Sequence, residues 1–228
     1  MQNICLIGAS GRMGQSIQSL LPSNTQIYGF SRLQNLDEKL NKAVQKSDVV
    51  IDFSNPENLA YVTKACTEYK IPLMCGTTGI HQEHFDLLKV TSKNIPVLYA
   101  ANTSIGIAIL KKAVSLVATA FENAKLQNDI TISETHHNLK KDSPSGTALA
   151  LGNAINKIVH NPISYSSIRG GNVVGEHTVH FFSNDEVIKL SHECLNRNVF
   201  AEGAIKAAEW LLSKPSGLYN IDDVLGVS

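Results

Sequence analysis

The sequence predicts an α/β domain with a doubly wound parallel sheet and a second, α+β domain with a mixed or antiparallel sheet. Over the first hundred residues, apolar strand-like runs alternate with helix-like runs, and a glycine-rich turn follows the first strand. After residue 160, strand-like runs follow one another without helices between them. Alternation favours parallel strands, and consecutive strands favour antiparallel pairing. A chain of 228 residues is long enough for two domains.

The first predicted strand, residues 4–7, runs directly into the glycine-rich turn. Glycines at positions 8, 11 and 14 form a G-x-x-G-x-x-G pattern, and a helix carrying Ile17 and Leu20 follows. Such glycines permit a tight turn, close approach of the backbone to a pyrophosphate, and close packing of helix on strand. A purely structural turn could use the same residues, but the position at the first strand-to-helix turn favours a Rossmann-like dinucleotide site.

The residues after the next strand, 26–30, indicate which dinucleotide binds. Ser31 and Arg32 stand where an NAD-binding domain normally has an acidic residue that accepts hydrogen bonds from ribose hydroxyls. A guanidinium group instead holds a phosphate through paired hydrogen bonds. We therefore expect NADPH to be preferred over NADH, unless Arg32 is simply a solvated surface residue.

The remaining elements of the first domain continue the alternation. The fourth strand ends at the loop Gly76-Thr77-Thr78-Gly79, and an open parallel sheet binds ligands at the carboxyl ends of its strands. His81 and His84 lie one helical turn apart without a third ligand in view, so no metal site is predicted. Helices are expected at 37–46, 82–92 and, after a turn, within 54–69, and strands at 49–53, 72–75 and 97–100.

The second half begins with a long apolar helix, expected at 104–122, that could bridge two domains. A strand at 129–133 and a helix at 145–159 precede three strand-like runs, with Asn184-Asp185 as a plausible hairpin turn between the last two. The expected strands are 163–169, 176–182 and 186–193, followed by a helix at 200–212 and a segment at 219–224 that could pack on the first domain. We therefore assign 1–103 and 200–228 to a dinucleotide-binding domain, and 104–199 to a second domain, whose substrate-binding and oligomerisation role is implied only by the family resemblance given below.

Residues 134–147 combine two adjacent histidines, two lysines and a Ser-Gly-Thr turn before a predicted helix. Such a connection offers groups that titrate near neutral pH, fixed positive charge and free backbone N–H donors. This mixture suits a small anionic substrate that must also receive a proton. An ordinary polar surface loop is the alternative, but the glycine loops elsewhere in the chain favour a site.

Other polar residues give weaker signals. His177 and His180 are three apart on a predicted strand and so face opposite sides, which argues against joint metal ligation. Arg197 lies at a strand-to-helix junction and could line a site, mark a hinge or serve as surface charge.

The composition narrows the possible partners. Twenty basic and twenty acidic residues cancel, so no global field favours nucleic acid or an anionic membrane. Neither a secretory leader nor a membrane-spanning run is evident. The four cysteines are far apart and fit no zinc or disulfide pattern, so we expect reduced thiols and a cytoplasmic protein.

Taken together, these motifs resemble the 4-hydroxy-tetrahydrodipicolinate reductase (dihydrodipicolinate reductase) family of the diaminopimelate route to lysine. The resemblance spans essentially the whole chain, and the double histidine at 136–137 with the following Pro-Ser-Gly-Thr is its most specific part. It also includes the motifs at 8–14, 76–79, 100–102, 140, 169–171, 175–177 and 197–203.

The resemblance implies a function and a set of site residues. The family reduces a cyclic unsaturated dicarboxylate with NADH or NADPH and usually forms a homotetramer through the sheets of its second domain. His136 and Lys140 match the catalytic acid/base and proton-donor positions, and His137, Gly146 and Thr147 match positions that hold substrate carboxylates. The positions that match cofactor contacts are Gly8, Ala9, Ser10, Gly11, Arg12, Met13, Arg32, Gly76, Thr77, Thr78, Ala100, Ala101, Asn102 and Thr103.

The sequence also departs from the family pattern. Many members have an acidic residue where Ser31 stands, which supports NADPH, and an aromatic residue often stands at the position of Thr103. Some members carry a further histidine at the position of Leu139. The stretch between Arg32 and Val49 is shorter than in many relatives.

Two other functions fit part of the pattern. Another small-substrate NAD(P)-dependent oxidoreductase would share the domain plan, but aldehyde chemistry needs an activated cysteine. Cys75, the one candidate beside a glycine loop, ends a buried strand and is better explained as core. A non-catalytic NAD(P)H-sensing module would not need the proton donors of residues 134–147.

Overall fold

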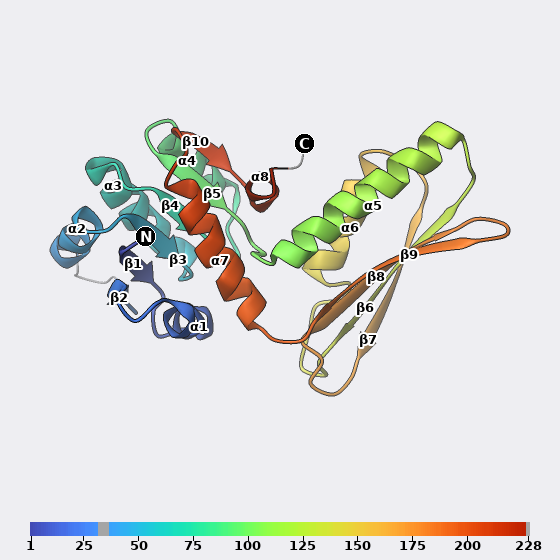
Figure 1. The fold of residues 1–228 in the computed structure, drawn as a ribbon, viewed down its shortest axis with the longest axis horizontal. Helices are drawn as coiled ribbons and strands as arrows, with labels where there is room; N and C mark the ends of the chain where they lie inside the picture. Colours follow the sequence, from blue (N-terminus) through green and yellow to red (C-terminus); the bar gives the residue numbers. More distant parts are fainter. Residues whose placement is uncertain (32–36, 227–228) are drawn as a thin grey trace. The chain divides into compact units, whose positions relative to one another are not determined.

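The computed structural model describes residues 1–31 and 37–226. The chain divides into two compact units, Met1–Ser104 with Asn198–Ser228, and Ile105–Arg197. The fold confirms the predicted pairing of a doubly wound α/β domain with an α+β domain (Figure 1).

The first unit is built on a six-stranded sheet in the order β10-β5-β4-β3-β1-β2, with every pair parallel. The inner strands are nearly continuous apolar runs because both faces of a parallel sheet are covered by helices. The strands are β1 (Asn3–Ile7), β2 (Gln26–Phe30), β3 (Val49–Asp52), β4 (Leu73–Cys75), β5 (Pro96–Tyr99) and β10 (Gly217–Tyr219).

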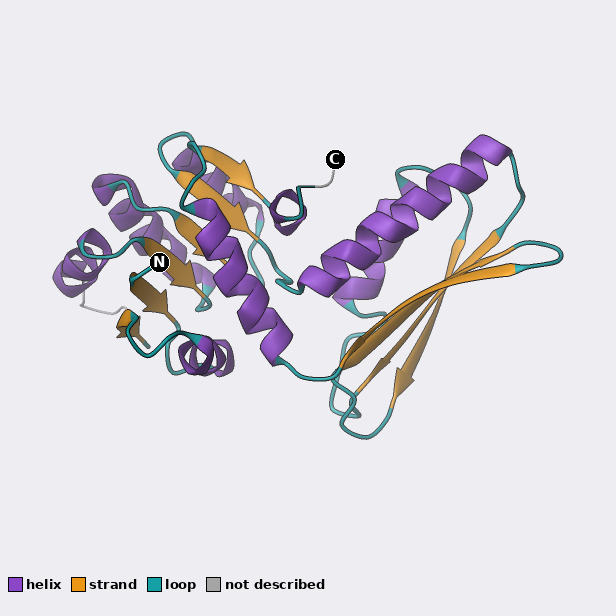
Figure 2. Cartoon of the chain, viewed as in Figure 1, coloured by secondary structure: helices purple, strands orange, loops and turns teal. Residues whose placement is uncertain are grey.

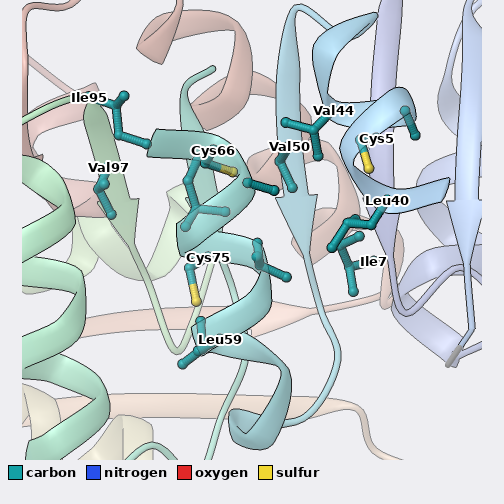
Figure 3. Packing of buried hydrophobic residues seen from close by; sticks show 14 of the residues in the cluster. Cys5, Ile7, Leu40, Val44, Val50, Leu59, Cys66, Cys75, Ile95 and Val97 are labelled. Atoms are coloured by element: carbon teal, nitrogen blue, oxygen red, sulfur yellow. The ribbon is translucent and has the colours of Figure 1, made fainter. Parts of the chain in front are cut away.

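Helices cover both faces of this sheet (Figure 2). Helices α1 and α7 contact each other, and α3 contacts α2 and α4. Cys5, Cys66 and Cys75 lie within the apolar core between sheet and helices (Figure 3). The helices are α1 (Arg12–Leu20), α2 (Asp37–Gln45), α3 (Leu59–Tyr69), α4 (Gln82–Ser92), α7 (Asn198–Leu211) and α8 (Ile221–Val224), with a 3₁₀ turn at Pro56–Asn58.

One strand of this sheet was not predicted. Residues 217–219 form β10, which pairs in parallel with β5 at the sheet edge. Three residues with a glycine among them carry no readable strand periodicity, so only the pairing with β5 defines this strand.

The second unit contains a mixed four-stranded sheet in the order β7-β6-β8-β9. Strand β6 (Asp129–His136) pairs in parallel with β7 (Ile163–Arg169) and antiparallel with β8 (Gly175–Phe182), which in turn pairs antiparallel with β9 (Val187–Cys194). Helices α5 (Ile105–Ala124) and α6 (Gly146–Asn156) pack together with this sheet over a second apolar core. Among the described residues, no helix has both the length and the hydrophobicity needed to cross a bilayer.

Strand β6 is longer than predicted. The sequence suggested that a loop begins at Glu134, but the strand continues to His136 because pairing with β8 extends to Thr135 and pairing with β7 extends to His136. Glu134 and His136 are two residues apart on this strand, so their side chains point to the same face, and both are buried.

The glycine at position 14 tests the close packing of the first turn. A Cβ added at Gly14 would lie 2.7 Å from the carbonyl oxygen of Ala9, a backbone atom that cannot simply rotate away. We expect Gly14→Ala to lower the free energy of unfolding in urea by about 2 kcal/mol or more.

Gly146→Ala is the matched control, because Gly146 is also helical and an added Cβ there meets nothing within 4 Å. This control should change the unfolding free energy by less than about 1 kcal/mol. Equal stability of Gly14→Ala and the wild type would contradict the close-packing explanation.

Candidate functional site

The predicted cofactor-binding residues of the first unit lie at the carboxyl ends of adjacent parallel strands. Gly8 to Met13 follow β1, Gly76 to Thr78 follow β4, and Ala100 to Thr103 follow β5. The strands β5, β4, β3 and β1 are consecutive and parallel in the sheet. Their carboxyl ends therefore lie side by side, and the structure brings these loops together there. Arg32, the remaining predicted cofactor contact, lies outside the described residues.

The turn after β1 has the features of a pyrophosphate site. Gly8 adopts a φ of +85° and its N–H donates to the carbonyl of Phe30, which closes the turn against β2. Gly11 is the N-cap of α1, no side chain caps that helix, and its first turn has no acidic residue. The first N–H groups of α1 therefore remain available to an anion, so the turn fits a dinucleotide.

A buried carboxyl group, Asp52 at the end of β3, connects the loops around it. Its Oδ1 accepts hydrogen bonds from the backbone N–H (3.0 Å) and the hydroxyl (2.6 Å) of Ser54. The Ser54 N–H also approaches Oγ1 of Thr77 at 3.1 Å, and the Gly76 N–H donates to the Asp52 carbonyl at 2.8 Å. These contacts hold the Gly76–Thr78 loop against the end of β3.

The environment of Asp52 disfavours its ionised form. The residue is 0% exposed, and its Oδ2 has no hydrogen-bond partner among the described residues. Burial therefore raises the pKa of Asp52 to about 6, although the hydrogen bonds from Ser54 and Thr77 oppose this change. Burial, together with the Asp52 charge, also raises the pKa of the Cys75 thiol to about 12.

Hydrogen bonds to β4, to α7 and within the loop itself fix the loop after β5. The N–H of Ala100 donates to the carbonyl of Cys75, and Oδ1 of Asn102 accepts from the N–H of Ser104. Thr103 is buried, and its hydroxyl donates to the carbonyl of Phe200 at 2.6 Å. Thr103 thus braces the start of α7.

In the second unit, His136 lies within a network of buried and charged groups. Its Nδ1 bonds to Oε2 of Glu134, and Arg169 donates to both oxygens of Glu134 at 2.9 and 2.7 Å. Arg169 occupies the position on β7 that pairs with His136, so the sheet register places the guanidinium beside Glu134.

This network sets the charges of its members. Burial alone would raise the pKa of Glu134, but hydrogen bonds from Arg169, Ser167 and His136 outweigh it and lower the pKa to about 2. Burial lowers the pKa of His136, and the charges of Lys140 and Arg169 lower it further, against the opposing effect of Glu134. At neutral pH, an ionised Glu134 therefore faces a neutral imidazole.

The loop after β6 carries the other predicted substrate residues. Lys140 pairs with both carboxylate oxygens of Asp142 at 2.8 Å, and the backbone N–H of Lys140 donates to the carbonyl of His137. Ser145 caps α6 by accepting the N–H of Ala148, and Gly146 and Thr147 then form the first turn of the helix. The lysine and this helix start both suit a carboxylate.

His177 supports this site from β8. Its Nε2 lies 3.0 Å from the hydroxyl of Ser145, and its ring meets that of His136 edge-on at 5.0 Å between centroids. Burial, followed by the charge of His136, lowers the pKa of His177 to about 4. His180 is half-buried while His177 is buried, which confirms that they face opposite sides of the strand.

The sequence interpretation did not assign roles to Asp52, Glu134, Ser145, Arg169 or His177. The two-residue spacing of Glu134 and His136 was a usable signal, but it required β6 to extend through both. Arg197 is exposed at the end of the second unit. Among the described residues, no group of His, Cys, Asp and Glu side chains is arranged to hold a metal ion.

The chain is similar to known proteins over nearly its whole length. The family model described as dihydrodipicolinate reductase, N-terminus, matches residues 2–103, and the model of the C-terminus matches residues 106–225. The 4-hydroxy-tetrahydrodipicolinate reductase of Bdellovibrio bacteriovorus is 43% identical over 226 residues, covering 97% of this chain and 95% of the relative. The enzyme of the same name from Rickettsia rickettsii is 41% identical over 241 residues, covering 98% and 99%.

Solved structures agree with the fold. A dipicolinate-bound dihydrodipicolinate reductase from Paenisporosarcina sp. TG-14 superposes with a TM-score of 0.76 at 21% identity, covering 98% of this chain and 99% of the other. A DAP dehydrogenase from C. glutamicum reaches a TM-score of 0.57 at 10% identity, with coverages of 97% and 93%. At these identities the similarity concerns the fold alone.

The raised pKa of Asp52 predicts how stability depends on pH. The folded protein holds this proton more tightly than the unfolded chain, whose carboxyl has the ordinary pKa of 3.8. Stability is therefore lost as pH rises from about 4 to about 6, by roughly 3 kcal/mol. Asp52→Asn lacks this loss, so urea unfolding should show its stability rising relative to wild type between pH 4 and pH 7.5.

Asp48→Asn is the control of opposite sign. Backbone hydrogen bonds from Asn3 and Gln2 lower the pKa of Asp48, so its stabilising effect is present above pH 4 and lost below it. This variant should therefore lose stability relative to wild type as pH rises to about 4, and its difference from wild type should stay nearly constant from pH 4 to pH 7.5. An Asp52→Asn difference that does not change with pH would contradict the assigned environment.

Proposed function

The chain belongs to the dihydrodipicolinate reductase family, and from that premise we propose which residues serve the NAD(P)H-dependent reduction of 4-hydroxy-tetrahydrodipicolinate to tetrahydrodipicolinate. The match over the full length of reductases about 40% identical carries the activity, which belongs to diaminopimelate and lysine biosynthesis. The residue roles are inferred from the hydrogen-bonded group of Glu134, His136 and Arg169. Lys140 and the start of α6 lie on the connection that follows β6.

In this proposal, residues 1–103 and 200–228, which make up nearly all of the first unit, form the dinucleotide-binding domain, and residues 104–199 bind substrate. The uncapped start of α1 and the turn from Gly8 to Met13 hold the pyrophosphate. The loops at 76–78 and 100–103 contact the rest of the cofactor from the same sheet edge. A reduced nicotinamide supplies the hydride when bound.

The cofactor preference proposed here is for NADPH over NADH. Strand β2 ends at Phe30, and exposed Ser31 follows where an acidic residue would bind the ribose of NADH. Without that carboxylate, a 2′-phosphate meets no repulsion at this position. Arg32 then supplies a guanidinium for the phosphate.

The second unit, in this proposal, holds the substrate dicarboxylate. The N–H groups of Gly146 and Thr147 at the start of α6 bind one carboxylate, with His137 assisting. Lys140 supplies the positive charge for the other. Its present partner, Asp142, is largely exposed, so a substrate carboxylate can replace it.

In this proposal Lys140 donates the proton, and His136 orients the groups around it. Loss of the 4-hydroxyl group as water leaves a conjugated ring, hydride transfer to that ring leaves negative charge on it, and a carbon must then be protonated. His136 is neutral near pH 7 because burial and two neighbouring cations lower its pKa, so its ring holds no spare proton. The ammonium of Lys140 carries one.

Two competing functions lack support in the molecule. Thiol chemistry would need an activated cysteine, whereas Cys75 is fully buried with a pKa raised to about 12. A sensor that only binds the dinucleotide would not need the arrangement around His136.

The open face of the second sheet suits assembly into a homotetramer. Ile168, Phe182 and Val187 share this face, and each is more than a third exposed. A sheet face with exposed large apolar side chains is a suitable interface.

All four cysteines are free and buried, which supports a cytoplasmic location.

A coupled assay tests the activity and the cofactor. The substrate is generated from pyruvate and aspartate semialdehyde by its synthase, and oxidation of NADPH and NADH is followed separately. We expect NADPH to give the higher kcat/KM.

Arg32→Ala should raise the KM for NADPH about tenfold or more, because a charged hydrogen bond is lost, and it should leave the KM for NADH nearly unchanged. Equal effects on both would remove the phosphate-binding role, and no oxidation of either would refute the reductase.

The proton-transfer roles are tested by Lys140→Ala and His136→Ala. Lys140→Ala should lower kcat by about 10²–10⁴-fold, since a positioned acid contributes about that much. His136→Ala should also lower kcat, because the groups that the imidazole orients are then misplaced. The loss should be larger for Lys140→Ala. Lys141→Ala is the matched control, because this neighbouring lysine is exposed, and it should keep near-wild-type turnover. Near-wild-type turnover of both test variants would show that the assignment is wrong.

A further inference from the structure

Glu134 is a charged group enclosed by protein atoms in the second unit, the unit that binds substrate in the proposed function. Its side chain is 1% exposed, so it cannot itself reach a substrate. Every polar contact of its carboxylate goes to the protein: His136, both terminal nitrogens of Arg169, and Ser167. Any effect of Glu134 on the reaction must therefore pass through these neighbours.

The contact with His136 determines where the imidazole proton lies. Hydrogen bonds from Arg169 keep Glu134 ionised, and an ionised carboxylate can only accept. The ring nitrogen Nδ1 must therefore donate. In a neutral ring the other nitrogen, Nε2, is then unprotonated and can accept a hydrogen bond. Gly175 leaves room beside it, since a Cβ added there would lie 3.0 Å from Nε2.

Arg169 extends the same arrangement to the loop that carries Lys140. Its NH2 donates to Glu134 and also to the backbone carbonyl of Asp142 at 2.7 Å. Asp142 in turn holds the ammonium of Lys140. One guanidinium thus links the strand that carries His136 to the loop that carries the lysine.

We propose that Glu134 and Arg169 are positioning residues of the reaction. Glu134 fixes His136 as its Nδ1–H tautomer with Nε2 ready to accept a hydrogen bond, and Arg169 ties this pair to the backbone beside Lys140. This inference rests on the proposed roles of His136 and Lys140. The other titratable or charged groups that act on the imidazole are His177 on β8, Lys140 on the loop and Arg169 on β7.

The tautomer can be measured without substrate. In ¹⁵N-histidine NMR of the free wild-type protein, with His136 assigned by its absence in His136→Ala, we expect the Nδ1–H signature at pH 7.5. In Glu134→Gln an amide N–H₂ can donate to Nδ1 instead, so the signature should shift toward Nε2–H. In the coupled assay this variant should lose about 10²-fold in kcat, with KM changed less than about threefold, because the imidazole is misplaced for the reaction.

Two further variants separate the contributions. Arg169→Lys keeps the charge but loses the paired hydrogen bonds, so the Nδ1–H signature should remain while kcat falls about tenfold. Glu122→Gln is the matched control, because it makes the same chemical change at an exposed position of α5, which packs on the opposite face of the sheet from the one proposed for assembly. It should leave both the signature and kcat unchanged.

The outcomes distinguish this inference from the proposed function. An Nε2–H signature in wild-type His136, or a Glu134→Gln variant within threefold of wild-type kcat, overturns it. The wild-type measurement decides even if Glu134→Gln does not fold. An inactive wild type with an Nδ1–H His136 would refute the reductase and leave the tautomer assignment standing.

Discussion

The proposed substrate site of the second unit depends on the need of a buried carboxylate for hydrogen-bond donors. Glu134 has left water almost completely, and an unpaired charge there would cost several kcal/mol. Arg169 meets this need with a paired interaction, and His136 adds a further donor. Satisfying the carboxylate therefore fixes the side chains of two strands at once. The imidazole orientation follows from this buried interaction, and the loop that carries Lys140 is held by the same guanidinium.

A second buried carboxyl group shows the opposite result. Asp52 has only neutral donors at one oxygen and no partner among the described residues at the other, so burial raises its pKa. Glu134 has a guanidinium, and its pKa falls despite similar burial. The difference between them is the presence of a cation within hydrogen-bond distance. In the proposed function each result suits its place, since Asp52 braces the loops assigned to the anionic cofactor and Glu134 orients an imidazole.

Local sequence signals were sufficient for the fold and for the loops of the first unit. Apolar runs, the glycines at 8, 11 and 14, and the loop after Cys75 lie close together in sequence, so their geometry is readable there. The pairing of Glu134 with Arg169 is not readable, because the residues are 35 positions apart and meet only through the register of β6 with β7. The same reason explains the missed strand β10, which is defined by β5 alone. Family resemblance supplied His136 and Lys140, but not the groups that orient them.

The two cations of the proposed substrate site, Arg169 and Lys140, differ in how firmly they are held, and this difference matches their proposed roles. Arg169 is bound by a paired interaction with a carboxylate that is 1% exposed, so releasing it would strand a buried charge. Lys140 is paired with Asp142, whose side chain is 57% exposed, and such a pair contributes little to stability. A single-point ammonium on a flexible stem can therefore leave Asp142 for a substrate carboxylate, while the guanidinium remains in place. In the proposed mechanism, the fixed cation Arg169 keeps the imidazole in place, and the exchangeable cation Lys140 binds the substrate.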